Sequence, residues 1–183
     1  MVPAPDVFSA SIGLRDGTRL RILPLGPDDR ARIADGFARL SAASRESRFL
    51  RPMSRLDGAT LDYLSDIDGH RHLAVGARSL DDDCVGLARC VRLEGEPDVA
   101  EVAVTVLDFW QRRGAARVLV TELARWADLV AIRKFRALFR YDNVAVTRLL
   151  RGAGVPVVAD GGGLVRADVD LSLILGNAGP ARA

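Results

Sequence analysis

Hydrophobic and polar residues alternate along several short stretches of the chain. Leu20 and Ile22 alternate with Arg19 and Arg21, which predicts a strand with one face in water. The most regular alternation lies near the C-terminus, and we expect one continuous strand there. Strands are expected over residues 18–23, 72–77, 84–93, 99–106, 135–139, 155–158 and 164–175.

Other stretches carry apolar residues three or four positions apart, as in amphipathic helices. Ile33, Phe37 and Leu40 follow Pro27 and two acidic residues, which is a favourable helix opening. Residues 41–55 are rich in Ser and Arg and are interpreted as a mixed helix-and-loop region. Further helices are expected over residues 56–67 with Asp57 as cap, 114–129, and 142–151 with Asp142 or Asn143 as cap and Gly152 as the stop.

The order of these elements predicts the fold class. One strand, helices, three strands, a helix, a strand, a helix and two strands indicate an α/β (α+β) protein with a single mixed, mostly antiparallel sheet of about seven strands. The length of 183 residues suits one domain, expected over residues 1–175, followed by a tail over residues 176–183.

Composition narrows the possible classes of protein. The formal net charge is only +2, and basic and acidic residues are interspersed, so no nucleic-acid surface is expected. Cys84 and Cys90 lie at opposite ends of one expected strand, too far apart for a disulfide. With His70 and His72 as the only histidines, we expect no metal site. No signal peptide or membrane span is apparent, so the cytoplasm is the expected compartment.

The segment from Glu101 to Arg117 carries the most chemistry. An apolar strand leads into a short turn, and a helix is expected to begin at Gly114, where unpaired backbone N–H groups form an anion site. Small residues at Gly114 and Ala116 would let a pyrophosphate approach the backbone, and Arg112, Arg113 and Arg117 add positive charge. The alternative is that Gly114 simply starts a helix.

The motif Q-x-x-G-x-A, formed by Gln111, Gly114 and Ala116, follows a strand and precedes a helix, and Asp142-Asn143 opens the next helix. This resembles the GCN5-related N-acetyltransferase (GNAT) family, over almost the whole chain. The stretches 46–51, 61–68 and 72–75 look like the subgroup containing bacterial protein lysine acetyltransferases.

The resemblance implies a binding site for acetyl-CoA. The backbone of Val104, Thr105 and Val106 would pair with the pantetheine arm, and an amide there would polarise the thioester carbonyl. The turn from Arg112 to Arg117, which includes Ala115, would cradle the pyrophosphate. Asn143 matches an asparagine that contacts the cofactor in the family, and it is equally suited to a plain helix cap.

Glu101 is the candidate general base. A lysine amine has a pKa of about 10.4 and must lose a proton before it attacks a thioester, and a carboxylate can accept that proton. Glu101 lies ten residues before Gln111, where many family members carry such a glutamate. The alternative is a solvated glutamate at a sheet edge. Leu150 stands where many members carry a tyrosine that protonates the leaving thiolate, and Val155 replaces an aromatic residue after Gly154.

Three other groups of residues are secondary candidates. His70 and His72 suit either catalysis or a structural role, and Arg45, Arg48 and Arg51, aligned along a helix, would form either an acceptor-selecting row or a solvated basic face. Phe109 and Trp110 are expected to anchor the loop beside them to the core.

The sequence therefore predicts an acetyl-CoA-dependent N-acetyltransferase, monomeric or homodimeric, with Glu101 as base. A protein lysine is the first choice of acceptor and a small amine the second. The alternative is a non-catalytic CoA sensor or partner-binding module with the same fold. A nucleotide-binding protein would need a G-x-G-x-x-G or Walker motif, which the sequence lacks.

Overall fold

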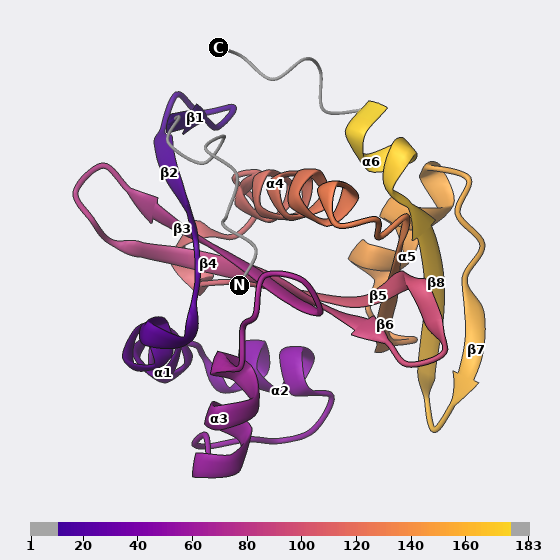
Figure 1. Cartoon of the computed structure of the whole chain (residues 1–183), viewed down its shortest axis with the longest axis horizontal. Helices are drawn as coiled ribbons and strands as arrows, with labels where there is room; N and C mark the ends of the chain where they lie inside the picture. Colours follow the sequence, from indigo (N-terminus) through magenta and orange to yellow (C-terminus); the bar gives the residue numbers. More distant parts are fainter. Residues whose placement is uncertain (1–10, 177–183) are drawn as a thin grey trace.

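The computed structural model describes residues 11–176, which form one eight-stranded sheet with helices on both faces (Figure 1). The order across the sheet is β1-β2-β3-β4-β5-β6-β8-β7, and every neighbouring pair is antiparallel except β5 with β6. The strands are β1 (Ser11–Gly13), β2 (Arg19–Pro24), β3 (His72–Ser79), β4 (Cys84–Leu93), β5 (Glu96–Val106), β6 (Lys134–Arg140), β7 (Val158–Gly161) and β8 (Leu164–Asp170).

The helices divide between the two faces. The long helix α4 covers one face, and α1, α2 and α3 cover the other (Figure 1). The helical elements are η2 (Pro27–Asp29), α1 (Arg30–Ala38), α2 (Ala42–Phe49), α3 (Gly58–Ser65), η3 (Asp108–Trp110), α4 (Ala115–Leu129), α5 (Val144–Gly152) and α6 (Leu171–Gly176).

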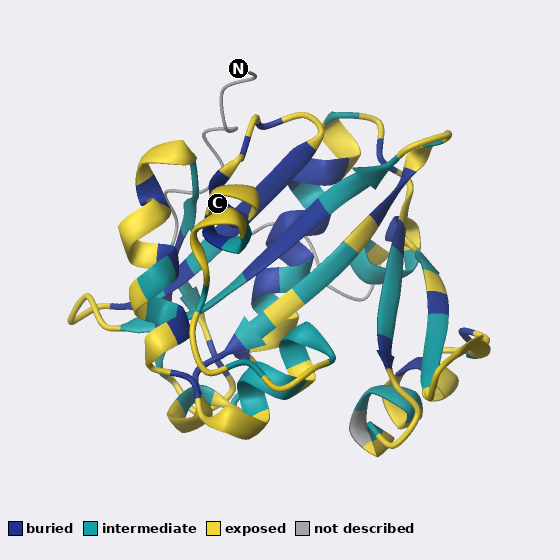
Figure 2. Cartoon of the chain, turned by 90° about the horizontal axis from the view of Figure 1, so that it is seen from below, coloured by how far each residue is buried: buried dark blue, intermediate teal, exposed yellow. Residues whose placement is uncertain are grey.

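The main core lies between α4 and the sheet. Leu119 and Leu123 of α4 are fully buried against Leu73, Ala100 and Phe135 of the strands. Figure 2 shows the same division by burial, with the helix surfaces that face solvent in yellow and the sheet interior in dark blue. Burial of this apolar surface holds α4, and with it the loop before α4, in a fixed position on the sheet.

Local sequence signals explain several element boundaries. The side chain of Asp57 caps α3 by accepting a hydrogen bond from the Thr60 N–H at 2.7 Å. Asn143 caps α5 in the same way, with the Val146 N–H 3.2 Å from its Oδ1, so Asn143 rather than Asp142 is the cap. Gly152 is the last residue of α5.

The expected single strand over residues 164–175 is wrong in its second half. β8 ends at Asp170, and Leu171–Gly176 form α6 instead. The Asp170 carboxylate accepts hydrogen bonds from the Ser172 N–H and the Ser172 hydroxyl, at 2.9 and 2.6 Å, and thereby stabilises a helix start. Alternation continues through this turn, which is why periodicity alone misplaced it.

The structure differs from the expected elements at four other points. The sheet has eight strands because β1 was not predicted, and the seventh strand lies at Val158–Gly161 rather than at residues 155–158. Gly176, assigned to the tail, ends α6, and residues 177–183 lie outside the described residues. Arg51 lies beyond α2, because the chain turns at Leu50 with a φ of 57°, so the three arginines do not form one helical row.

Candidate active site

A gap opens in the sheet where β5 and β6 stop pairing. The parallel register runs from Val99–Lys134 to Val102–Ala137 and goes no further. β5 nevertheless continues to Val106 and stays paired with β4 on its other side. Among the described residues, the β6-facing edge of residues 103–106 therefore has no strand partner, and its backbone polar groups are left for a ligand or solvent.

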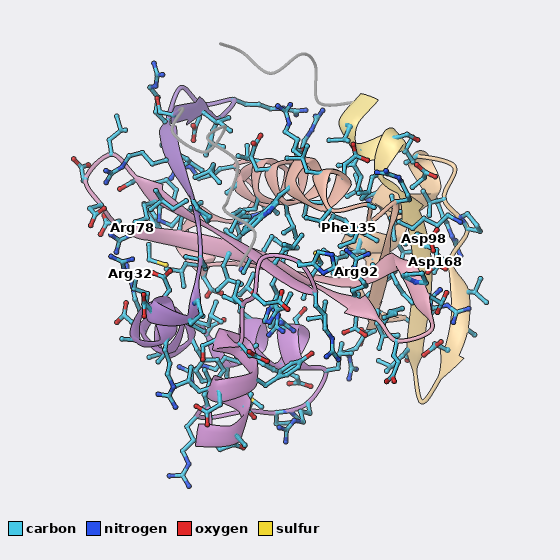
Figure 3. The ribbon with its side chains drawn as sticks, in the orientation of Figure 1. Arg32, Arg78, Arg92, Asp98, Phe135 and Asp168 are labelled. Carbon is cyan, nitrogen blue, oxygen red and sulfur yellow. The ribbon has the colours of Figure 1, made fainter. Side chains whose placement is uncertain are left out.

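A cavity of about 760 Å³ occupies this gap. Glu101 and Val104 of β5 line one wall, and Phe135 and Ala137 of β6 line another. Phe135 is labelled in Figure 3, near the end of α4. A cavity of this size is within the range of small-molecule and cofactor sites.

The loop before α4 has an unusual backbone. Arg112 and Gly114 both have positive φ, at 61° and 97°, and Gly114 is the N-cap of α4. In the described part of the chain, no side chain caps this helix, and a β-carbon at Gly114 would meet no other atom within 4 Å. The first N–H groups of a helix, here those of Ala115 and Ala116, have no acceptor within the helix. The open helix end therefore suits a phosphate group.

Gln111 joins this loop to two other elements. Its Nε2 donates to the Val106 carbonyl and to the Ser44 hydroxyl, each at 3.1 Å. The carboxylate of Asp108, in η3, accepts three further hydrogen bonds from Ser41 and Ser44 at the start of α2. These bonds fix the loop against β5 and α2.

Arg113 joins the loop to the N-terminal hairpin. Its Nε donates to the Asp16 carboxylate at 2.7 Å and its Nη2 to the Thr18 hydroxyl at 2.6 Å. The Thr18 N–H and Arg113 together lower the pKa of Asp16 to about 2. The Arg113 guanidinium also lies over the Trp110 ring, 4.5 Å from the ring centroid. Phe109, by contrast, is 80% exposed, so its expected role as a core anchor is wrong, whereas Trp110 packs against the core.

The structure brings five of the predicted site residues together around the cavity. Glu101, Val104, Ala116, Arg117 and Asn143 line it. The other predicted site residues do not line this cavity. Thr105 lines a second cavity, and Val106 and Ala115 are buried. Arg112 and Gly114 are exposed in the loop, and Gln111 and Arg113 make the contacts described above.

Leu150 also lines this cavity and is buried at the position where the family often has tyrosine. It packs with Phe139, Val155 and Ala167. An apolar side chain here cannot donate a proton, so any protonation of a leaving group needs another donor.

Two polar residues, His72 and Arg89, share the sheet face that carries Glu101. In the strand register Glu101 lies opposite Val91, and Val91 lies opposite His72. Arg89 lies two residues before Val91 on β4, so its side chain points to the same face. Glu101 and Arg89 are thus diagonal neighbours on adjacent strands, a spacing that long side chains can bridge.

Arg89 was not singled out from the sequence, yet it is the most enclosed cation of this face. Its residue is only 4% exposed, and its Nη1 and Nη2 are buried with no hydrogen-bond partner among the described residues. Its guanidinium lies over the Tyr63 ring, 4.7 Å from the centroid. Burial lowers the pKa of Arg89, and the charges of Tyr63 and Glu101 partly offset this effect.

Arg48 of α2 is the second cation at this place. Burial and the charge of Arg89 lower its pKa to about 10, and the charge of Glu101 acts in the opposite direction. Arg48 lines the cavity between β5 and β6 as well as the second cavity. Arg45, in contrast, is structural, because it donates to the carbonyls of Phe37, Ala38 and Ser54.

His72 is buried and neutral near physiological pH. Burial and the charge of Arg89 lower its pKa from 6.5 to about 4. Its Nδ1 lies 2.6 Å from the Asp66 carbonyl, which assigns the proton to Nδ1, and Nε2 is buried without a partner among the described residues. His70 is exposed, so the two histidines have different surroundings.

The protein-family comparison assigns the class. The model of the acetyltransferase (GNAT) family matches residues 36–155. The chain therefore belongs to the acetyltransferase (GNAT) family, and the family resemblance seen in the sequence is confirmed. In the described part of the chain, no helix is both long and apolar enough to cross a membrane.

Two individual acetyltransferases are similar to this chain in sequence. Acetyltransferase PA5475 of Pseudomonas aeruginosa is 34% identical over 137 residues, covering 72% of this chain and 70% of its own. Acetyltransferase Pat of Mycolicibacterium smegmatis is 29% identical over 161 residues, covering 87% of this chain and 48% of Pat. The present chain thus corresponds to about half the length of Pat.

Solved structures agree with this placement. The GNAT domain of S. lividans PAT superposes with a TM-score of 0.83 at 27% identity, covering 92% of this chain and 99% of that domain. A spermidine N-acetyltransferase from Vibrio cholerae, in complex with CoA and spermine, gives a TM-score of 0.65 at 15% identity. The superposition covers 85% of this chain and 98% of the other, and at this identity it shows a similarity of fold alone.

Proposed function

We propose that this protein transfers an acetyl group from acetyl-CoA to an amine, with the acyl donor in the gap between β5 and β6. The observation that carries the proposal is the unpaired edge of residues 103–106 beside a 760 Å³ cavity that also receives the open start of α4. A strand edge suits the amide groups of pantetheine, and a helix start suits a pyrophosphate. The Pat and PA5475 relatives are acetyltransferases by name, which supports the same activity.

Glu101 is the proposed general base. Its carboxylate accepts the proton that the amine loses as the nitrogen attacks the thioester carbonyl. The C–N bond forms, the C–S bond breaks, and the CoA sulfur leaves and takes up a proton from water. Acetyl-CoA supplies the activated acyl group, and the backbone N–H groups of Val104 to Val106 are the proposed donors to the carbonyl oxygen.

Two classes of acceptor are proposed. A protein lysine is the first candidate, because the lysine-acetyltransferase-like stretches of the sequence extend over 46–51, 61–68 and 72–75. A small amine is the second.

The test is thioester turnover, followed by detection of free thiol, with acetyl-CoA and a panel of lysine peptides and small amines. We expect Glu101→Gln to lower kcat/KM by about 100-fold or more, in the range of general-base catalysis. Asp98→Asn is the matched control, because Asp98 is an exposed carboxylate of the same strand that does not line the cavity. Wild-type turnover by Glu101→Gln at every pH would remove Glu101 as the base.

A second candidate function is a CoA-binding sensor without catalysis. The buried Leu150 in place of the family tyrosine favours it. A thermal-shift titration separates the two: stabilisation by CoA with no turnover of any amine supports the sensor. The absence of any stabilisation by CoA or acetyl-CoA would contradict both functions.

A further inference from the structure

A second cavity, of about 370 Å³, lies between the sheet and the helices α1, α2 and α3. Its walls are mainly apolar, with Leu25, Ile33, Phe37 and Leu64 among them. Arg32 and Arg78, which also line it, lie at the end of the sheet away from Asp168 (Figure 3). The cavity therefore offers room for an apolar group.

One wall of this cavity holds Arg89, the buried cation described above. A buried guanidinium whose terminal nitrogens lack acceptors is unfavourable unless an anion completes it. The Tyr63 ring covers one side of the guanidinium, and neither Nη1 nor Nη2 makes a hydrogen bond within residues 11–176. A planar carboxylate matches this donor pair best, because two parallel N–H···O bonds fit the guanidinium fork.

The second cavity adjoins the first one. Arg48 and Phe49 of α2 line both. Glu101 lines the first cavity, while Arg89, its diagonal neighbour on β4, lines the second. A compact molecule at this junction can thus place one group against Arg89 and another against Glu101, since diagonal positions on adjacent strands are about 7–8 Å apart.

The charges at the junction indicate the sign of the ligand. Two cations, Arg48 and Arg89, stand against one carboxylate, Glu101, and His72 is neutral. A single negative charge would balance the set.

We propose that the acceptor is a small amine that carries a carboxylate and an apolar side chain, as an apolar α-amino acid does. The carboxylate pairs with Arg89 with support from Arg48, the side chain occupies the 370 Å³ cavity, and the amine faces Glu101. This inference rests on the proposed function, and among its acceptors it favours the small amine over the protein lysine.

The experiment compares leucine, leucinamide and a lysine peptide as acceptors in the thiol-release assay. The wild-type protein should turn over leucine with a kcat/KM at least tenfold above that for leucinamide. Arg89→Met should raise KM for leucine by about 10- to 100-fold, the usual range for loss of a charged hydrogen-bonded pair, and should thereby abolish the preference for leucine over leucinamide. Arg71→Met, at an exposed arginine just before β3, is the control and should change neither.

Binding gives a readout that does not depend on turnover. The probe is 4-methylpentanoate, which is leucine without its amine. It should compete with leucine and raise the melting temperature of the wild-type protein and of Arg71→Met, and it should do neither in Arg89→Met. Arg89→Met should itself remain folded, because an apolar side chain of similar volume replaces an uncompensated buried charge. Arg89→Lys, which keeps the charge without the fork, should recover only part of the leucine discrimination.

The outcomes separate this inference from the proposed function. Turnover of a lysine peptide or leucinamide as fast as leucine, unaffected by Arg89→Met, would overturn the carboxylate acceptor and leave the acetyltransferase proposal standing. Binding of 4-methylpentanoate without competition against leucine would also overturn it, since the anion site would then lie apart from the acceptor. No turnover of any amine, with CoA binding intact, would reject the catalytic proposal itself.

Discussion

Gly86 on β4 lies so close to Thr105 on β5 that a β-carbon at Gly86 would stand 2.4 Å from the Thr105 carbonyl oxygen and 2.9 Å from the Val106 Cα. Both contacts are with backbone, which cannot rotate away as a side chain can. Glycine at this position therefore sets how near β4 comes to the part of β5 that borders the gap.

Gly86→Ala should displace β5 at residues 105–106. We expect a loss of about 1–3 kcal/mol in the free energy of unfolding, the range for overpacking, and a higher KM for acetyl-CoA. Chemical denaturation and steady-state kinetics measure the two effects. Gly13→Ala, on strand β1 with no atom within 4 Å of the added carbon, is the control and should leave both unchanged. An unaltered KM in Gly86→Ala would show that this contact does not shape the gap.

Gln111→Ala should loosen the loop before α4. The variant loses two hydrogen bonds, to Val106 and to Ser44, worth about 1 kcal/mol each. We expect KM for acetyl-CoA to rise several-fold with a smaller change in kcat, since the loop is the proposed pyrophosphate site and does not contain the proposed base. Gln111→Glu, which keeps the size but not the amide donor, should behave like Gln111→Ala. A wild-type KM in both variants would assign no positioning role to Gln111.

Arg136 should contribute more to stability than an ordinary surface arginine. It makes two hydrogen bonds to Glu96 and two to Asp168, and so joins β5, β6 and β8 across the far side of the gap. These partners lower the pKa of Asp168 and of Glu96 and raise that of Arg136. Arg136→Met should lower the melting temperature, with a larger effect at low salt than at high salt. Arg30→Met, which breaks the more exposed ion pair with Asp62, should change the melting temperature little. Equal changes in the two variants would show that Arg136 stabilises the protein no more than a surface arginine does.

His72 should make stability depend on pH. The unfolded histidine takes up a proton below about pH 6.5, whereas the folded one does so only near 4. Between these values the unfolded state binds more protons, so stability falls as the pH falls, by up to about 3 kcal/mol over the whole window. Urea denaturation from pH 7.5 to 4 measures the slope. His72→Gln should flatten it and His70→Gln, at an exposed site, should not.

The sequence predicted the elements whose signals are local. Asp57 was identified as a cap, and the strand-turn-helix from Glu101 to Arg117 was found by its small residues and position. The α6 boundary was missed because Leu171 and Leu173 continue the alternation of β8 while Asp170 starts a helix. The alternation of apolar and polar residues can continue past the end of a strand, because a single capping residue starts a helix without changing that alternation.

The polar face beside Glu101 was largely beyond prediction from the sequence. In the sequence Arg89 is one arginine among many, and its surroundings depend on distant segments: β4 pairs there with Ala74 of β3 and Ala103 of β5, and Tyr63 of α3 covers its guanidinium. A usable signal was present: an arginine at an inward-facing position of an apolar strand. The second contributor, Arg48, comes from a helix forty residues away in sequence, and no local pattern connects the two.

The short pairing between β5 and β6 also affects the rigidity of the sheet. Within residues 11–176, the strand ladder that connects the part of the sheet built from β1 to β5 with the part built from β6, β8 and β7 has only four residue pairs, and the Arg136–Glu96 hydrogen bonds add a side-chain link. A ligand that forms hydrogen bonds with the backbone of residues 103–106 and contacts Asn143 before α5 would connect these two parts. Binding of this ligand should slow amide hydrogen exchange in both parts of the sheet. The bound co-substrate would then stabilise the sheet as an additional strand does.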